Sequence, residues 1–142
     1  MQSSNVDQTV HTDTQVPTIT DITFKSNNIF DDASARDGSL VTLLFTVSDD
    51  SPIPSSTAAI LTVTISGQTR TLVGAPDVLD VAGKSKRYTY QWAAPGSPAV
   101  TQAGYTINVI DAANNAATAS AANVIAVGAC VSLCRACCFT SY

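Results

Sequence analysis

The segment Leu40-Val41-Thr42-Leu43-Leu44-Phe45-Thr46-Val47-Ser48 decides the fold class of this chain. Val41, Leu43, Phe45 and Val47 recur at every second residue, which is the period of a β-strand with one face buried. Two further leucines lie on the opposite face, so that face is expected to be partly covered as well. The segment therefore predicts a strand in the middle of a sheet.

Shorter runs with the same alternation lie on both sides of this segment. Ser66-Gly67-Gln68 predicts a tight hairpin turn, Pro95-Gly96-Ser97-Pro98 ends a strand, and Asp111–Asn115 predicts a second hairpin. The other strands are expected over residues 16–24, 59–66, 68–73, 78–81, 86–92, 105–110 and 116–127. In the first of these, one inward face is expected to carry Val16, Thr18, Thr20, Ile22 and Phe24. About seven strands without a helical period between them predict an all-β, two-sheet antiparallel sandwich.

The composition agrees with this fold class and limits the function. The chain has 142 residues, 45% of them hydrophobic and 13% charged, which suits one compact domain with short tails. All eleven acidic residues are aspartates, and 18 threonines and 14 valines favour strands and turns. The seven basic residues are scattered, so neither nucleic acid nor an anionic membrane surface is an expected partner. We see no secretory signal after Met1 and no apolar run of the ~18 to 20 residues that a membrane helix requires.

Three regions follow from the changes in composition along the chain. Residues 1–16 are polar and form an N-terminal extension that is a candidate pairing strand. Residues 17–127 carry the strand pattern and form the sandwich. Residues 128–142 form a Cys-rich tail, and the composition changes most sharply at Gly128.

Four segments carry a more specific pattern: Pro17–Thr20, Asp37–Ser48, Tyr88–Trp92 and Gly104–Asn115. Together they resemble bacterial immunoglobulin-like domains, which recur in surface adhesins and extracellular fibres. The resemblance covers about residues 17–127, and its most specific part is the ending Tyr-x-Ile-x-Val-x-Asp-Ala-Ala-Asn-Asn. It implies an immunoglobulin-like antiparallel β-sandwich of about seven strands.

The resemblance also implies roles for single residues near that ending. Tyr105 is expected to act as a tyrosine corner, with its hydroxyl bonded to the backbone upstream. Related domains usually have glycine where Asn114 or Asn115 stands. Asparagine accepts a positive φ better than most residues, so the turn is still expected to form.

The sequence offers little for catalysis. His11 is the only histidine and lies in the N-terminal extension, so neither a Ser-His-Asp triad nor a histidine zinc centre is expected. The pairs Asp31-Asp32 and Asp49-Asp50 are better explained as turn residues than as a general acid and base. We therefore predict no enzyme, no catalytic residue and no cofactor.

Calcium is a minor alternative to this prediction. Hard cations take several oxygen ligands, and Asp49, Asp50, Asp111 and Asn114 are expected at loop ends of the sandwich. No Asp-x-Asp-x-Asp-Gly loop is present, so no metal site is predicted. If calcium binds, it is expected at a domain junction.

Tyr88, Tyr90 and Trp92 share one face of an expected strand. If that face were exposed, the three rings would form a candidate ligand face on which sugars stack. If it is buried, the rings fill the core. Only 6% of the residues are aromatic, so the core interpretation is preferred.

The tail holds all four cysteines of the chain: Cys130, Cys134, Cys137 and Cys138. The first three match an iron–sulfur spacing of radical enzymes, but a sandwich has no barrel domain for that chemistry. A four-thiolate zinc site would need two separated Cys-x2-Cys pairs. Disulfide cross-links between subunits and a tail of free thiols remain equal alternatives.

The expected function follows from the resemblance, from the lack of a catalytic constellation and from the two extensions. We expect a non-enzymatic, extracellular or cell-surface structural module that associates with copies of itself in a fibre or surface assembly. A carbohydrate-binding or host-adhesion domain is the alternative, with a glycan or a surface protein as partner. Head-to-tail contacts between copies would give open filaments unless the rotation closes.

Overall fold

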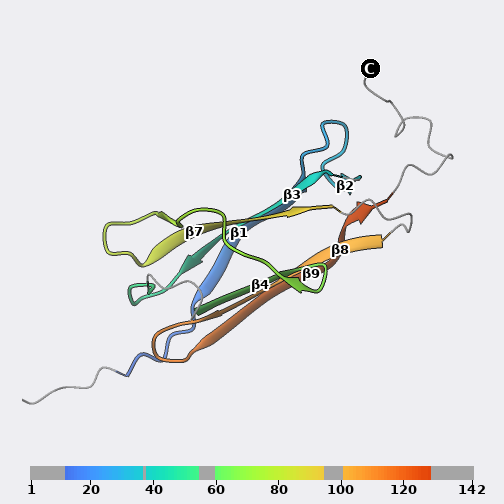
Figure 1. The fold of residues 1–142 in the computed structure, drawn as a ribbon. Helices are drawn as coiled ribbons and strands as arrows, with labels where there is room; N and C mark the ends of the chain where they lie inside the picture. Colours follow the sequence, from blue (N-terminus) through green and yellow to red (C-terminus); the bar gives the residue numbers. More distant parts are fainter. Residues whose placement is uncertain (1–11, 37, 55–59, 95–100, 129–142) are drawn as a thin grey trace, which may run out of the picture.

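Two β-sheets packed face to face form the fold (Figure 1). The computed structural model describes residues 12–36, 38–54, 60–94 and 101–128. Its strands are β1 (Thr18–Ser26), β2 (Ser34–Ala35), β3 (Leu40–Ser48), β4 (Leu61–Ile65), β5 (Gln68–Thr69), β6 (Asp77–Val78), β7 (Ser85–Ala93), β8 (Thr101–Ile110) and β9 (Ala116–Val127).

The strand order confirms the predicted fold class. One sheet has the order β1-β3-β7-β6 and the other the order β2-β9-β8-β4-β5. All pairings are antiparallel except the short parallel pairing of β2 with β9. The ladders β1-β3-β7-β6 and β9-β8-β4 follow the order of an immunoglobulin-type sandwich.

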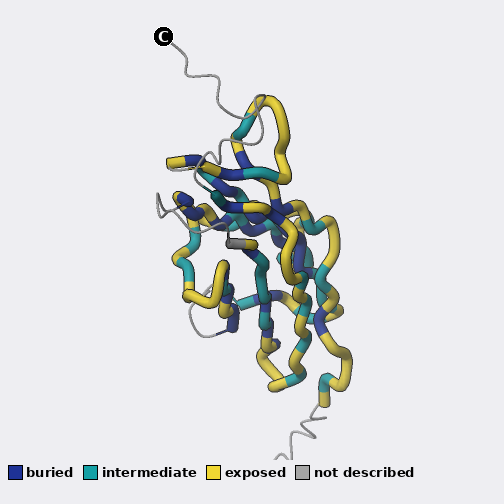
Figure 2. Tube along the Cα trace, turned by 90° about the vertical axis from the view of Figure 1, so that its right-hand side faces the viewer, coloured by how far each residue is buried: buried dark blue, intermediate teal, exposed yellow. Residues whose placement is uncertain are grey.

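The core lies between the two sheets and is centred on β3. This strand pairs with β1 on one side and with β7 on the other, so the predicted central position is confirmed. Val41, Leu43, Phe45 and Val47 are fully buried. From the facing sheet, Leu61, Val63 and Ile65 of β4 also point into the core, as their alternation predicts. Figure 2 shows the buried residues gathered in the interior, with exposed residues mostly at the periphery.

The β4–β5 hairpin forms where it is predicted, but β5 is shorter than expected. Ser66 and Gly67 both have positive φ, 54° and 75°, as a two-residue turn of the primed type requires. β5 ends at Thr69 because the chain then crosses to the other sheet, where Leu72 forms a bridge with Tyr90. The predicted strand over 68–73 is therefore wrong in its second half.

In β1, the residues before the bulge do not face the core as the sequence predicts. The register between β1 and β3 shifts between Thr20 and Thr23, because Asp21, at φ 51°, takes part in a β-bulge. Ile19 packs against the core before the bulge and Ile22 packs against it afterwards. The residues that were predicted to face inward before the bulge are exposed: Val16, Thr18 and Thr20.

The remaining expected strands are present, with shifted ends in some cases. β9 has the predicted bounds, β7 and β8 extend beyond theirs, and the expected edge strand over 78–81 is the shorter β6. Among the described residues, no helix is long and apolar enough to cross a membrane.

Candidate functional site

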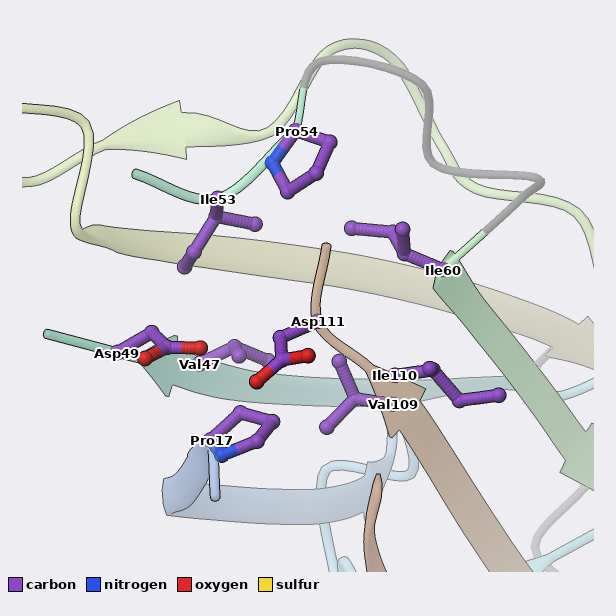
Figure 3. Close-up of a pocket in the computed structure, with 9 residues that line it drawn as sticks. All are labelled: Pro17, Val47, Asp49, Ile53, Pro54, Ile60, Val109, Ile110 and Asp111. Carbon is purple, nitrogen blue, oxygen red and sulfur yellow. The ribbon is translucent and has the colours of Figure 1, made fainter. Parts of the chain in front are cut away.

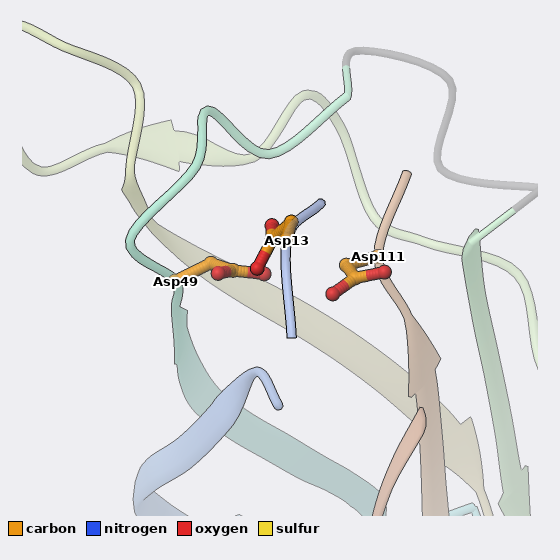
Figure 4. Close-up of side chains that lie close together, drawn as sticks. All are labelled: Asp13, Asp49 and Asp111. Atoms are coloured by element: carbon orange, nitrogen blue, oxygen red, sulfur yellow. The ribbon is translucent and has the colours of Figure 1, made fainter. Parts of the chain in front are cut away.

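Three segments meet at one end of the sandwich, which we call the aspartate pole: residues 12–17, 49–54 and 111–115. Asp13, Asp49 and Asp111 point toward one another there (Figure 4). Each offers one carboxylate oxygen, and these oxygens lie within 4.8 Å of one another. The structure thus brings together two of the candidate calcium ligands from the sequence, Asp49 and Asp111. Asp50 is not one of the three clustered carboxylates.

Asp13 is the member of the cluster that sequence reasoning missed. It lies in the polar extension, where no strand pattern or motif marks it. Its Oδ2 accepts a 2.7 Å hydrogen bond from the Ser51 hydroxyl, and its Oδ1 accepts one of 3.0 Å from the Gln15 N–H. Its backbone oxygen accepts a 3.2 Å hydrogen bond from the Asn115 side chain. Asp13 therefore ties the segment before β1 to the loops that follow β3 and β8.

Asp111 closes the turn between β8 and β9. Its Oδ1 accepts hydrogen bonds of 2.8 Å from the backbone N–H groups of Ala113 and Asn115, and its Oδ2 accepts one of 2.7 Å from the Asn115 side chain. Asn114, between these donors, has φ 69°, so the turn does form with asparagine at a position of positive φ. Asp111 is buried, and the hydrogen bonds that it accepts are partly buried.

We expect Asp111→Ala to lower the free energy of unfolding by about 2–3 kcal/mol, because it leaves two partly buried N–H donors without their acceptor. Urea unfolding followed by Trp92 fluorescence measures this loss. Asp111→Asn keeps one acceptor oxygen for the backbone donors, so its loss should be smaller. Equal losses for the two variants would contradict the assigned role of the Oδ1 atom.

The pKa values of two of the clustered carboxyl groups shift in opposite directions. Hydrogen bonds from Ser51 and Gln15 lower the pKa of Asp13, which keeps that carboxylate charged. Burial raises the pKa of Asp49, and the nearby carboxylates of Asp50 and Asp13 add to that shift. Carboxylates are the ligands that hard cations take. Here, however, N–H and O–H donors already bind Asp13 and Asp111, so the geometry is explained as a junction between segments.

An apolar hollow adjoins the aspartate pole (Figure 3). Asp49 and Asp111 line it together with seven apolar residues: Pro17, Val47, Ile53, Pro54, Ile60, Val109 and Ile110. It has room for about one water molecule, which is too little for a substrate. Nearby, the buried Lys86 ammonium donates a 2.8 Å hydrogen bond to the Ile53 carbonyl oxygen. This end of the sandwich therefore has no substrate pocket among the described residues.

The three aromatic residues of the candidate ligand face lie in the core. Tyr88, Tyr90 and Trp92 are 1%, 2% and 9% exposed. Phe45 of β3 stacks against both tyrosine rings, at centroid distances of 5.6 and 6.0 Å. The Arg70 guanidinium lies 5.6 Å from the Trp92 ring. The rings therefore offer no exposed platform for a sugar.

Burial of these tyrosines predicts a loss of stability at alkaline pH. Burial raises the pKa of Tyr88, and burial together with Tyr88 raises the pKa of Tyr90 from 10.0 to about 12. A raised folded pKa gives stability that is present below pH 10 and is lost as the pH rises toward 12. We expect the tyrosinate absorbance of Tyr88 and Tyr90 to appear at higher pH in the folded protein than in urea. Titration of these two side chains at the same pH in both states would contradict their buried placement.

The structure describes the ring contacts of Tyr105 but not His11 or the cysteines of the tail. Tyr105 packs edge-on against Phe24 with ring centroids 5.3 Å apart. Residues 95–100 of the backbone upstream of Tyr105 lie outside the described residues, so the tyrosine corner stays an expectation. His11 and the four cysteines of the tail, Cys130, Cys134, Cys137 and Cys138, lie outside the described residues.

The sheet edges differ in how they are protected. β5 and β6 end their sheets as two-residue strands, and the β1 edge carries the bulge at Asp21 and the charge of Lys25. Very short strands, bulges and charges are the features that keep edges from pairing with other chains. The β9 edge has none of them over Ala116–Ala121. β2 pairs only with Ala126 and Val127, so no described strand is hydrogen-bonded to the outer edge of β9 before these residues.

The hydrogen-bond pattern shows which backbone groups of β9 face this open edge. The Asp111 N–H donates to the Asn115 oxygen, and pairs in an antiparallel ladder alternate between bonded and non-bonded. The bonded pairs with β8 therefore include Ala117 and Ala119. Ala116, Thr118 and Ser120 fall in the non-bonded pairs, so their N–H and C=O groups point away from β8.

The described part of the chain thus presents an acidic junction at one pole and an open strand edge along β9. Searches of models of known protein families and of curated protein sequences find no match to this chain.

Proposed function

We propose that this protein is a non-enzymatic, extracellular or cell-surface structural module that associates with copies of itself in a fibre or surface assembly. One observation carries the proposal: over Ala116–Ala121, no described strand pairs with the outer edge of β9. Unpaired N–H and C=O groups along a strand edge are a template for pairing with another chain. The resemblance of residues 17–127 to immunoglobulin-like domains of adhesins and fibres supports the extracellular location.

The charge distribution supports association through this edge. The chain carries a net charge of -4, so two copies repel each other on average. β9 itself has no charged residue, since its sequence is Ala-Ala-Thr-Ala-Ser-Ala-Ala-Asn-Val-Ile-Ala-Val. A contact along β9 therefore brings two acidic chains together where neither carries charge.

Light scattering during size exclusion tests the proposal on the full-length chain, with and without reductant. We expect species larger than the 14.7 kDa monomer in both conditions, with a concentration-dependent mass. A monomer at every concentration in both conditions would overturn the proposal. Deletion of residues 1–16 is a poor test of the N-terminal extension, because it also removes Asp13 and its contacts with Ser51 and Asn115. Point variants on β9 are therefore preferable.

A further inference from the structure

We propose that the partner of β9 is β9 of a second copy, paired antiparallel with Thr118 opposite Thr118 of that copy. This inference rests on the proposed self-association and specifies its contact. It predicts a dimer with a two-fold axis, in which the five-stranded sheets of two copies join into one continuous sheet; this dimer is the unit that a second contact would extend into a fibre or surface assembly.

The backbone geometry selects this register. The straight part of β9 lies between the turn at Asn114, with φ 69°, and an irregularity at Asn123, with φ 58°. Within it, Ala116, Thr118 and Ser120 direct their N–H and C=O groups outward. Antiparallel pairing centred on Thr118 sets Ala116 of each copy opposite Ser120 of the other. All three outward residues then form bonded pairs, and no residue of the turn or of the irregularity is needed.

The side chains and charges permit two copies to approach this closely. Ala116, Thr118 and Ser120 are exposed on the outer face of the sheet and are small, so no bulky group separates the two strands. The Thr118 hydroxyl donates to the Asn108 side chain at 2.8 Å, which holds it in place beside its symmetry mate. Threonine pairs across strands are favourable. Because β9 carries no charge, this register brings no like charges together along the paired strands.

The other edges explain why the contact is confined to β9. The β1 edge, which belongs to the other sheet, is interrupted by the bulge between Thr20 and Thr23 and carries Asp21 and Lys25. β5 and β6 are too short to align a second chain. Among the described strands, β9 therefore offers the longest run of outward backbone groups that no bulge or charge interrupts.

Ser120→Pro tests the contact, because it removes an outward N–H without removing a bond between β8 and β9, and edge strands tolerate proline in that position. By symmetry the dimer loses two hydrogen bonds. We therefore expect its dissociation constant, measured by light scattering over a range of concentrations, to rise about tenfold or more. Ser120→Lys should act in the same direction by adding like charges to both copies. Thr62→Lys, on an exposed position of β4, adds the same charge away from the edge and should leave the dimer intact.

Thr118→Cys tests the register, in a chain whose four native cysteines are replaced by serine. Residues in a bonded antiparallel pair have Cα atoms about 5.5 Å apart, and their Cβ atoms are farther apart than in most disulfides, so a short bifunctional thiol reagent is used to link the two introduced thiols. We expect this reagent to give a covalent dimer for Thr118→Cys and none for Thr62→Cys.

The outcomes separate this inference from the proposed function. A dimer that resists Ser120→Pro and Ser120→Lys, with circular dichroism unchanged, would overturn the β9 contact while self-association stands. So would large species that disappear only with reductant, because they assign assembly to the cysteines of the tail. A dimer that is sensitive to both variants but fails to link through Thr118→Cys would overturn the register. A chain that binds added extended peptides at β9 but does not bind a second copy would overturn the β9–β9 contact. A chain that stays monomeric throughout would overturn both.

Discussion

Gly104→Ala should lower the free energy of unfolding by about 3 kcal/mol, because the position has no room for a methyl group. Gly104 lies where the register between β8 and β9 shifts, between Ala103 and Tyr105. A Cβ atom there would lie 2.9 Å from the Ala122 Cα and closer still to the Ala121 carbonyl oxygen. Both are backbone atoms, so the clash is relieved only by moving β9 away from β8.

Urea unfolding followed by Trp92 fluorescence measures this effect, with Gly67→Ala as the matched control. Gly67 has open space around its Cβ position, and only its φ of 75° opposes the substitution. Its expected loss is about 1 kcal/mol, which is the strain of a left-handed conformation. A Gly104→Ala loss no larger than that of Gly67→Ala would mean that the two strands are not in contact at the irregularity.

The alternation of apolar residues was sufficient to predict the strands that have one buried face. Residues 40–48 and 61–65 carry uninterrupted period-2 patterns, and their inward faces are as predicted. β1 differs because the bulge at Asp21 adds a residue to the strand, and a period-2 pattern changes face at such a point. The sequence Thr-Ile-Thr-Asp-Ile-Thr-Phe is compatible with either face on each side of the bulge. The choice is made by pairing with β3, which is far away in sequence.

In the candidate site too, the sequence predicts the residues that a local pattern places, but not those placed by contacts distant in sequence. Aspartates after strands are readily placed at loop ends, as Asp49 and Asp111 were, but their spacing in the sequence does not show that they meet. Asp13 was not foreseeable, because its position depends on hydrogen bonds to Ser51 and Asn115, which are distant in sequence. The open edge of β9 was not foreseeable either. Whether a strand ends a sheet depends on which strands pair, and the alternation along β9 carries no information about that.

Phe45→Ala should lower the free energy of unfolding by about 4 kcal/mol, which is in the range for removal of a fully buried phenylalanine ring. Phe45 has no exposed surface, and its ring stacks against Tyr88 and Tyr90. Phe45→Leu keeps most of the apolar volume, so we expect it to cost about 1–2 kcal/mol. Val78→Ala, at a side chain that is 60% exposed, should change stability by less than about 0.5 kcal/mol.

The same variants decide between the two interpretations of the aromatic face, as core and as ligand platform. If the rings are core, Trp92 emission is blue-shifted in the folded protein and unchanged by added glycans, and Phe45→Ala is far more harmful than Val78→Ala. If the rings were instead a surface for sugars, Phe45→Ala would resemble Val78→Ala in its effect on stability, and glycans would change Trp92 emission. The second outcome would contradict the stacked arrangement. It would also favour a glycan bound at the aromatic face, rather than a second copy paired along β9, as the partner of this protein.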